Sequence, residues 1–148
     1  MFYFAYGSNL NHKRMKNRCK GAKYLRSYTL KGYKLIFSFR DPTEPYGYAN
    51  IEKKLNSKVP GAIWKITKKD EIILDGYEGV HLGFYDKEYF NWKGKKVLVY
   101  IQKDYIKKIP NSWYLHIIIR GYKDCTLNLN YLKNRVSFYS SIKYPIKW

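Results

Sequence analysis

Apolar and polar positions alternate over short stretches along much of the chain, and glycine, proline and asparagine separate these stretches. Alternation with a period of two is typical of strands with one buried face, and short continuous apolar runs are typical of fully buried strands. Lys31-Gly32 lies between two such stretches and predicts a hairpin turn. Residues 40–45, which contain two prolines, predict a loop. The expected strands span residues 2–6, 24–30, 33–39, 48–52, 62–66, 84–92 and 97–102.

Helix-start signals follow some of these strands. An asparagine or threonine side chain can accept a hydrogen bond from an unpaired N–H group of the first helical turn. Thr67 and Asp70 also have the spacing of a capping box. The expected helices are a short one within residues 10–18, capped by Asn9 or Asn11; one opened by Thr67 and ended by Gly76 or Gly79; one starting at residues 110–112; and one running from Asn128 or Asn130 to Phe138.

Strands and helices in this order do not alternate regularly, which indicates an α+β fold. The chain has 148 residues, of which 45% are apolar, and this fits a single domain across residues 1–148 that can bury a core. Residues 141–148 contain Pro145 and are expected to form an irregular tail.

The composition also indicates in which cellular compartment the protein is expected. No apolar run approaches the roughly 20 residues that a membrane span needs. The first residues lack the basic region of a signal peptide. Cys19 and Cys125 allow at most one disulfide, and we expect them to be free thiols. The sequence therefore predicts a soluble cytoplasmic protein that does not contact a membrane.

The balance of charge is strongly basic, with 29 Lys and Arg against 11 Asp and Glu, a net charge of +18. Such an excess is compatible with binding to nucleic acid. However, the basic residues are scattered in pairs such as Lys53-Lys54 and Lys95-Lys96, without a run of five. A compositional origin is therefore favoured over a nucleic-acid interface. In either case the field favours anionic ligands.

Signatures of cofactor-dependent and acyl-enzyme chemistry are absent. His12, His81 and His116 are isolated, so no zinc-ligand spacing is present. The sequence has no glycine-rich dinucleotide or phosphate loop, and Ser8 is not in a G-x-S-x-G motif. We therefore expect no cofactor and no metal.

Two short segments can carry chemistry. The first strand runs directly into Tyr6-Gly7-Ser8-Asn9, where Gly7 allows a sharp turn and the next N–H groups can face an anion such as a carboxylate. Glu78 lies between Tyr77 and Gly79-Val80, close to the end of a predicted helix. Burial and the negative helix end would raise the pKa of its carboxyl, which suits a general acid/base. Taken alone, each segment is better explained without a function, the first as an ordinary strand-to-helix turn and Glu78 as a surface glutamate paired with a basic side chain.

The order and spacing of several motifs narrow these alternatives. Together they resemble the signature of the γ-glutamylcyclotransferase family, also called AIG2-like, across roughly residues 2–138. The matching segments are YFAYGSNL at 3–10, LKGYKL at 30–35, GYANI at 47–51, GAIWKI at 61–66, LDxxEGV at 74–80, GFY at 83–85, and Tyr114 ahead of IIIxG at 117–121.

The resemblance implies a mixed β-barrel-like core with a few flanking helices, one pocket and no cofactor. It implies that the enzyme converts a γ-glutamyl amino acid or related γ-glutamyl amide to 5-oxoproline and a free amine. Glu78 matches the catalytic acid/base of the family. The residues that match its substrate-binding positions are Tyr3, Phe4, Ala5, Tyr6, Gly7, Ser8, Asn9, Tyr85 and Tyr114.

Other functions remain open at this point. The same scaffold can act on a γ-glutamylamine or on a γ-glutamyl-protected metabolite. A non-catalytic basic module that binds nucleic acid or an acidic partner is the alternative outside enzymes, although the presence of both Glu78 and the Tyr6–Leu10 loop argues against it. The expected partner is a small γ-glutamyl substrate, and the chain is expected to be a monomer or a homodimer.

Overall fold

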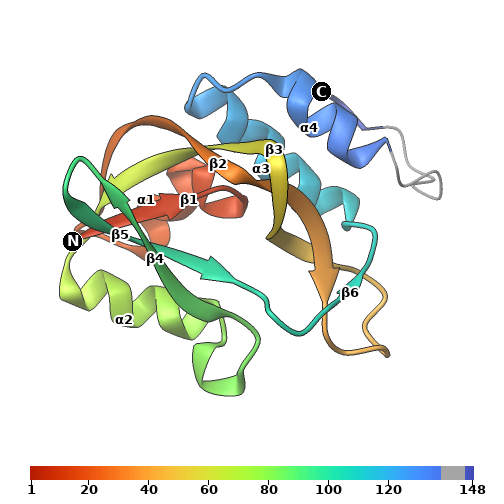
Figure 1. Cartoon of the computed structure of the whole chain (residues 1–148), viewed down its shortest axis with the longest axis horizontal. Coiled ribbons are helices and arrows are strands. Elements are labelled where there is room, and N and C mark those ends of the chain that lie inside the picture. Colours follow the sequence, from red (N-terminus) through yellow and green to blue (C-terminus); the bar gives the residue numbers. More distant parts are fainter. Residues whose placement is uncertain (138–145) are drawn as a thin grey trace.

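The computed structural model of the chain describes residues 1–137 and 146–148. Its centre is a six-stranded sheet that curls into a half-barrel, with the strand order β4-β5-β1-β3-β2-β6 (Figure 1). The β1–β5 pair is parallel and the other pairs are antiparallel. The strands are β1 (Phe2–Ala5), β2 (Lys23–Phe39), β3 (Tyr48–Lys65), β4 (Asp86–Trp92), β5 (Lys95–Ile101) and β6 (Ile106–Lys107).

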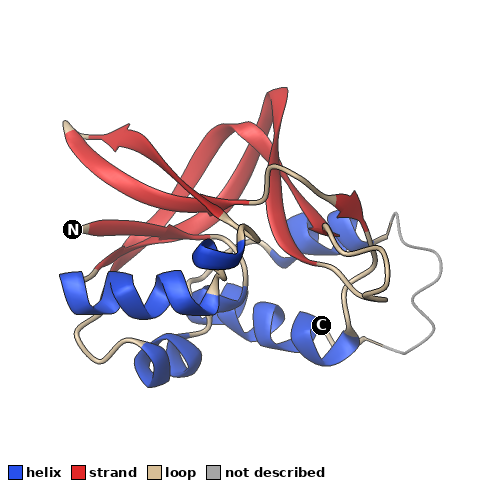
Figure 2. Cartoon of the chain, turned by 90° about the horizontal axis from the view of Figure 1, so that it is seen from below, coloured by secondary structure: helices blue, strands red, loops and turns tan. Residues whose placement is uncertain are grey.

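Four α-helices accompany the sheet, and most of the helical ribbon lies below it in the view of Figure 2. The expected caps are present. Asn11 rather than Asn9 caps the first α-helix, Thr67 and Asp70 form the capping box, and Asn111 and Asn128 cap the last two helices. The helices are α1 (His12–Arg18), α2 (Lys68–Tyr77), α3 (Ser112–Asp124) and α4 (Leu129–Val136), with short 3₁₀ turns η1 (Ser8–Leu10) and η2 (Val80–Leu82).

The predicted α+β class is confirmed, but the predicted hairpin turn at Lys31-Gly32 is wrong. β2 continues through this position and pairs with β3 on both sides of it, with a register shift between Lys31 and Tyr33. The chain reverses instead in the loop between Phe39 and Tyr48. A glycine at a strand irregularity and a glycine in a turn look alike in a sequence, and only the partner strand distinguishes them.

The end of the chain is described only in part. Phe138 and the tail residues 141–145 lie outside the described residues, and residues 146–148 have no regular secondary structure. In the part of the chain that the structure describes, no helix is long and apolar enough to cross a membrane. Cys19 and Cys125 are free, as expected, and both are buried.

The central strand β1 separates the two sides of the core. Phe4 is fully buried, and its ring lies 6.0 Å from that of Tyr28 and 5.7 Å from that of Phe90, inside the curl of the sheet. Tyr3 points to the other side, which it shares with its cross-strand partner Trp64, and the Trp64 ring packs against His12 of α1. β1 thus directs Tyr3 toward the helices and Phe4 away from them.

Candidate active site

The main cavity has a volume of about 560 Å³ and opens where β1, α2 and α3 converge. This volume lies within the range of small-molecule sites. Segments far apart in the chain meet there: the loop after β1, the end of α2 and the first turn of α3. Of the residues proposed from the sequence, those that line the cavity are Tyr3, Tyr6, Gly7, Ser8, Asn9, Glu78, Tyr85 and Tyr114.

Phe4 and Ala5 do not line the cavity. Phe4 faces the interior of the curled sheet, and Ala5 is 1% exposed within the paired part of β1. The sequence resemblance covers a continuous segment, whereas the strand turns Phe4 to the side opposite Tyr3. Ala5 lies on the side of Tyr3 but is covered within the paired strand. Phe4 and Ala5 therefore support the strand, and we expect substrate contacts from its neighbours.

Glu78 lies in the cavity because of how α2 ends. The Glu78 N–H donates to the Leu74 carbonyl at 2.9 Å, which makes Glu78 the C-cap residue. Gly79 follows with φ of 61°, and a Cβ there would lie 2.6 Å from the Phe84 ring. Only glycine combines this left-handed conformation with so close an approach. The reversal at Gly79 leaves the Glu78 side chain in the cavity wall.

The environment of Glu78 suits proton transfer. Burial raises the pKa of its carboxyl from 4.5 to about 7, although the positive charges of Arg18 and Arg14 oppose this shift. A pKa near neutrality allows a group both to accept and to donate a proton at physiological pH. The expectation of a raised pKa is thus consistent with the geometry of the site, with desolvation as its main cause.

The loop after β1 forms a second wall of the cavity. The 3₁₀ turn η1 is closed by Leu10 N–H donating to the Gly7 carbonyl at 3.1 Å. The first N–H groups of a helical turn have no acceptor within that turn, so those of Ser8 and Asn9 are left for another partner. The Asn9 side chain is held by two bonds: its Nδ2 donates to Tyr3 Oη at 3.0 Å, and its Oδ1 accepts from Arg18 at 3.1 Å.

Two cavity tyrosines are attached to one residue of β3. Ala49 donates its N–H to Tyr114 Oη at 3.0 Å and accepts at its carbonyl from Tyr85 Oη at 2.7 Å. Tyr85 Oη also accepts from Gln102 Nε2 at 3.0 Å. Because the Tyr114 oxygen is occupied as an acceptor, its own proton remains for a ligand in the cavity.

The tyrosines around Glu78 are donors rather than bases. Burial, and after it the Glu78 carboxylate, raises the pKa of Tyr3 and of Tyr6 far above the usual value for a phenol. Burial likewise raises the pKa of Tyr114. These hydroxyls stay protonated near neutral pH, which leaves the Glu78 carboxyl as the group beside them suited to exchange a proton there.

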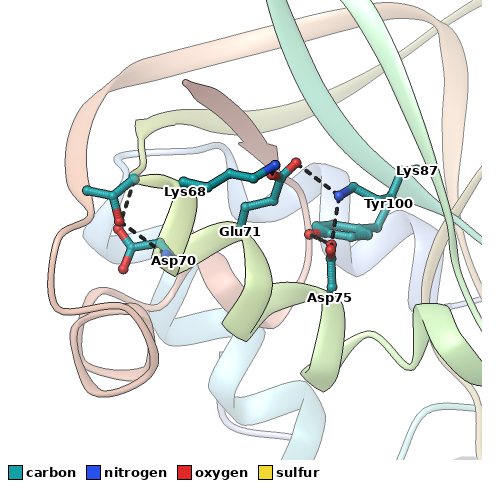
Figure 3. Close-up of polar contacts among 7 residues, drawn as sticks. Lys68, Asp70, Glu71, Asp75, Lys87 and Tyr100 are labelled. Carbon is teal, nitrogen blue, oxygen red and sulfur yellow. Dashed lines mark hydrogen bonds and ion pairs between the residues drawn. The ribbon is translucent and has the colours of Figure 1, made fainter.

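A network of ion pairs fixes α2 against the sheet (Figure 3). Tyr100 Oη donates to Asp75 at 2.7 Å, and Lys87 Nζ lies 3.0 Å from Asp75 and 2.9 Å from Glu71. Lys68 completes the chain with a contact of 2.8 Å to Glu71. Asp75 is one turn before Glu78, so this network holds the end of α2 in place relative to β4 and β5.

No metal site accompanies this arrangement: among residues 1–137 and 146–148, no group of three or more His, Cys, Asp or Glu side chains is placed to hold a metal ion.

Comparison with known proteins identifies the family of the chain. Residues 58–134 match the model of the AIG2-like family. A curated gamma-glutamylcyclotransferase from Homo sapiens is 32% identical over 138 residues, which cover 87% of this chain and 73% of the human protein. The chain belongs to the γ-glutamylcyclotransferase (AIG2-like) family. The family's curated member from Bos taurus is 31% identical, over 88% of this chain and 74% of that protein.

Solved structures extend the likeness to the whole γ-glutamylcyclotransferase fold. A gamma-glutamyl cyclotransferase structure superposes with a TM-score of 0.81 at 26% identity, and covers 99% of this chain and 93% of its own. An uncharacterized human protein gives the same TM-score at 30% identity, with 99% and 91% covered. The expected fold is confirmed, and these relatives support a cyclotransferase activity in general.

Several lining residues of this γ-glutamylcyclotransferase-like cavity were not proposed from the sequence. Arg14 and Arg18 lie four residues apart on α1 and both face the cavity. This spacing, directly after the Tyr6–Leu10 loop, is the signal that could have identified them, since residues i and i+4 share a helix face. Tyr77 and Tyr100 also line the cavity and carry no comparable signal, because tyrosine is abundant throughout the chain, and Trp113 lines it as well.

Proposed function

We propose that the protein is a cofactor-free cyclotransferase that converts a γ-glutamyl amino acid or related γ-glutamyl amide to 5-oxoproline and a free amine, with Glu78 as general acid/base. The observation that carries this proposal is the Glu78 carboxyl, with a pKa of about 7, in one cavity with the Gly7–Asn9 loop.

The reaction is an intramolecular aminolysis. The α-amine of the glutamyl group attacks its own γ-carbonyl carbon, a new C–N bond closes a five-membered lactam, and the original amide C–N bond breaks. Nucleophile and electrophile belong to one molecule, so no nucleophilic side chain is needed. The protein has to hold the folded conformer in which the two atoms are close.

Glu78 moves the proton that this exchange requires. Its carboxylate takes a proton from the substrate α-ammonium, which frees the lone pair for attack. The same carboxyl then donates this proton to the departing nitrogen as the amide C–N bond breaks. The carboxylate that this restores takes the second proton of the ring nitrogen and passes it to the released amine, which leaves as an ammonium. One group with a pKa near neutrality can perform both steps, whereas the protonated tyrosines around it cannot act as the base.

The remaining cavity residues would orient the substrate. We assign the N–H groups of Ser8 and Asn9 to the α-carboxylate of the glutamyl group, because they have no acceptor within η1. The Tyr114 hydroxyl, whose proton has no acceptor among the described residues, would donate to a carbonyl or carboxylate oxygen of the substrate. Gly7 brings this loop against Ala49 of β3, and Ala49 in turn holds Tyr85 and Tyr114.

The function is tested with a panel of γ-glutamyl compounds that differ in their leaving amine. Each reaction contains EDTA and no added nucleotide, and the 5-oxoproline formed is measured by mass spectrometry. We expect 5-oxoproline and the free amine in equal amounts, at rates that EDTA does not change. Release of free glutamate instead of 5-oxoproline would contradict the intramolecular step.

The pH dependence of kcat/KM provides a second test. Glu78 must start deprotonated, so kcat/KM should fall about tenfold per pH unit below a pKa near 7. Because the positive charge of Arg18 lowers the pKa of Glu78, the Arg18→Gln variant should move this acidic limb to higher pH. Profiles are measured at constant ionic strength. If kcat/KM fell only below about pH 4.5, this would argue against Glu78 as the base. The same conclusion would follow if the acidic limb of the Arg18→Gln variant lay at the same pH as that of the wild type.

A further inference from the structure

The two cations that line the main cavity are both arginines, Arg14 and Arg18. This is unexpected from composition, because only six of the 29 basic residues are arginines and the others are lysines. Arginine differs from lysine in its planar fork of N–H donors, which matches a carboxylate with two parallel hydrogen bonds. The choice of arginine therefore indicates recognition of a planar anion.

Arg14 and Arg18 have different surroundings. Arg18 is held by the protein: it donates to Asn9 Oδ1 at 3.1 Å, and its guanidinium carbon lies 4.0 Å from the centre of the Tyr77 ring. The Arg14 Nε is buried and has no hydrogen-bond partner among the described residues. No ion pair joins Arg14 to a carboxylate within residues 1–137 and 146–148, although Glu44 and Glu78 line the same cavity.

The Arg14 side chain lines the cavity, so its guanidinium can meet a ligand there, and a bound carboxylate would supply the counter-charge that no ion pair within the described residues provides. Burial, and next the charge of Arg18, lowers the pKa of the Arg14 guanidinium, and Tyr114 and Glu78 oppose this shift more weakly. The group best suited to Arg14 is thus a carboxylate of the ligand.

The chemistry of the substrate indicates which carboxylate this is. In the proposed function, the glutamyl α-carboxylate lies on the Ser8 and Asn9 amides, while Glu78 donates a proton to the departing nitrogen. That nitrogen must therefore lie beside Glu78. Arg14, Glu78 and Tyr114 line the same cavity, and the charge of Arg14 acts on both of the other groups. In an α-amino acid the carboxylate is attached to the carbon next to the nitrogen, so it would lie within reach of Arg14.

We propose that Arg14 binds the carboxylate of the leaving amino acid and thereby selects γ-glutamyl amino acids over γ-glutamylamines. This assignment rests on the proposed function, and it makes Arg14 the residue that distinguishes the two kinds of leaving group.

The test uses two substrates that differ only in that carboxylate, γ-glutamyl-alanine and γ-glutamyl-ethylamine. The wild-type protein should favour γ-glutamyl-alanine in kcat/KM. The Arg14→Gln variant should lose about 10–100-fold on γ-glutamyl-alanine, the usual range for a charge-assisted hydrogen bond, and less than threefold on γ-glutamyl-ethylamine. The Arg14→Lys variant, which keeps the charge without the fork, should fall between the two. Arg26→Gln is the matched control, since Arg26 is exposed on β2 outside the cavity.

Any other outcome contradicts the proposal, and each one does so for a different reason. Equal losses of Arg14→Gln on both substrates would place Arg14 on the glutamyl half or on Glu78. An unchanged variant would remove Arg14 from substrate binding. A wild-type protein that treats the two substrates equally would overturn the selection even if the variant fails to fold. A wild-type protein that forms 5-oxoproline from neither substrate would instead refute the proposed function, and this inference with it.

Discussion

Replacement of Glu78 by glutamine is expected to lower kcat by roughly 10³–10⁴-fold, near the upper end of the usual contribution of a general acid/base. Glutamine has nearly the same shape but cannot exchange a proton near neutral pH. One carboxyl serves both the attacking ammonium and the departing amine, so both transfers are lost together. KM should change little, because the Gly7–Asn9 loop is untouched.

The same variant should be more stable than the wild type, in a pH-dependent way. The pKa of Glu78 is about 7 in the folded protein against an ordinary value of 4.5, so its protonated form favours folding. That contribution is complete below pH 4.5 and is lost as the pH rises through 7. Above pH 7, Glu78→Gln should gain about 1–3 kcal/mol over the wild type, and near pH 4 the two should be similar.

Thermal unfolding and 5-oxoproline release measured on the same preparations test both statements. Glu88→Gln is the matched control, since Glu88 lies on β4 outside the cavity and pairs with Lys103. A Glu78→Gln variant that keeps kcat within threefold of wild type would refute the mechanism. A variant less stable than wild type above pH 7 would contradict the burial of a charge at this position.

Replacement of Gly7 by alanine is expected to lower kcat by about 100-fold, the effect of a small displacement within a reacting site. A Cβ at position 7 would lie 2.7 Å from the Ala49 Cβ, which belongs to a buried strand residue and cannot rotate away. Ala49 would have to move, and with it the hydroxyls of Tyr85 and Tyr114. The crowding should also cost about 1–3 kcal/mol of stability.

Gly76→Ala is the control for this substitution. Gly76 lies within α2, and a Cβ there meets no atom within 4 Å. It should raise stability by about 0.5–1 kcal/mol, because alanine favours the helix, and should leave kcat unchanged. If Gly7→Ala were as active as Gly76→Ala, the contact between the loop and Ala49 would have no part in positioning the substrate.

Local chemistry explains what could be predicted from the sequence. The capping box of Thr67 and Asp70 forms between residues three apart, so it depends on nothing distant. The same holds for the helix starts at Asn11 and Asn128. The α+β class followed from the order of such elements, and the placement of Glu78 at the end of a helix followed from Gly79. The family resemblance then indicated which of these segments belong together.

Pairing and packing between distant segments decided the rest. β2 runs through Lys31-Gly32 because β3 pairs with it on both sides, which no local pattern shows. Phe4 lies away from the cavity and Arg14 lies in it, although both are close in sequence to the Tyr6–Leu10 loop. The direction of a side chain depends on which face of its strand or helix it occupies, and on how packing against the sheet orients that face. The sequence by itself therefore determined the helix starts, the α+β class and the candidate acid. The tertiary structure decided how far the strands extend and which side chains surround that acid, because long-range contacts set both.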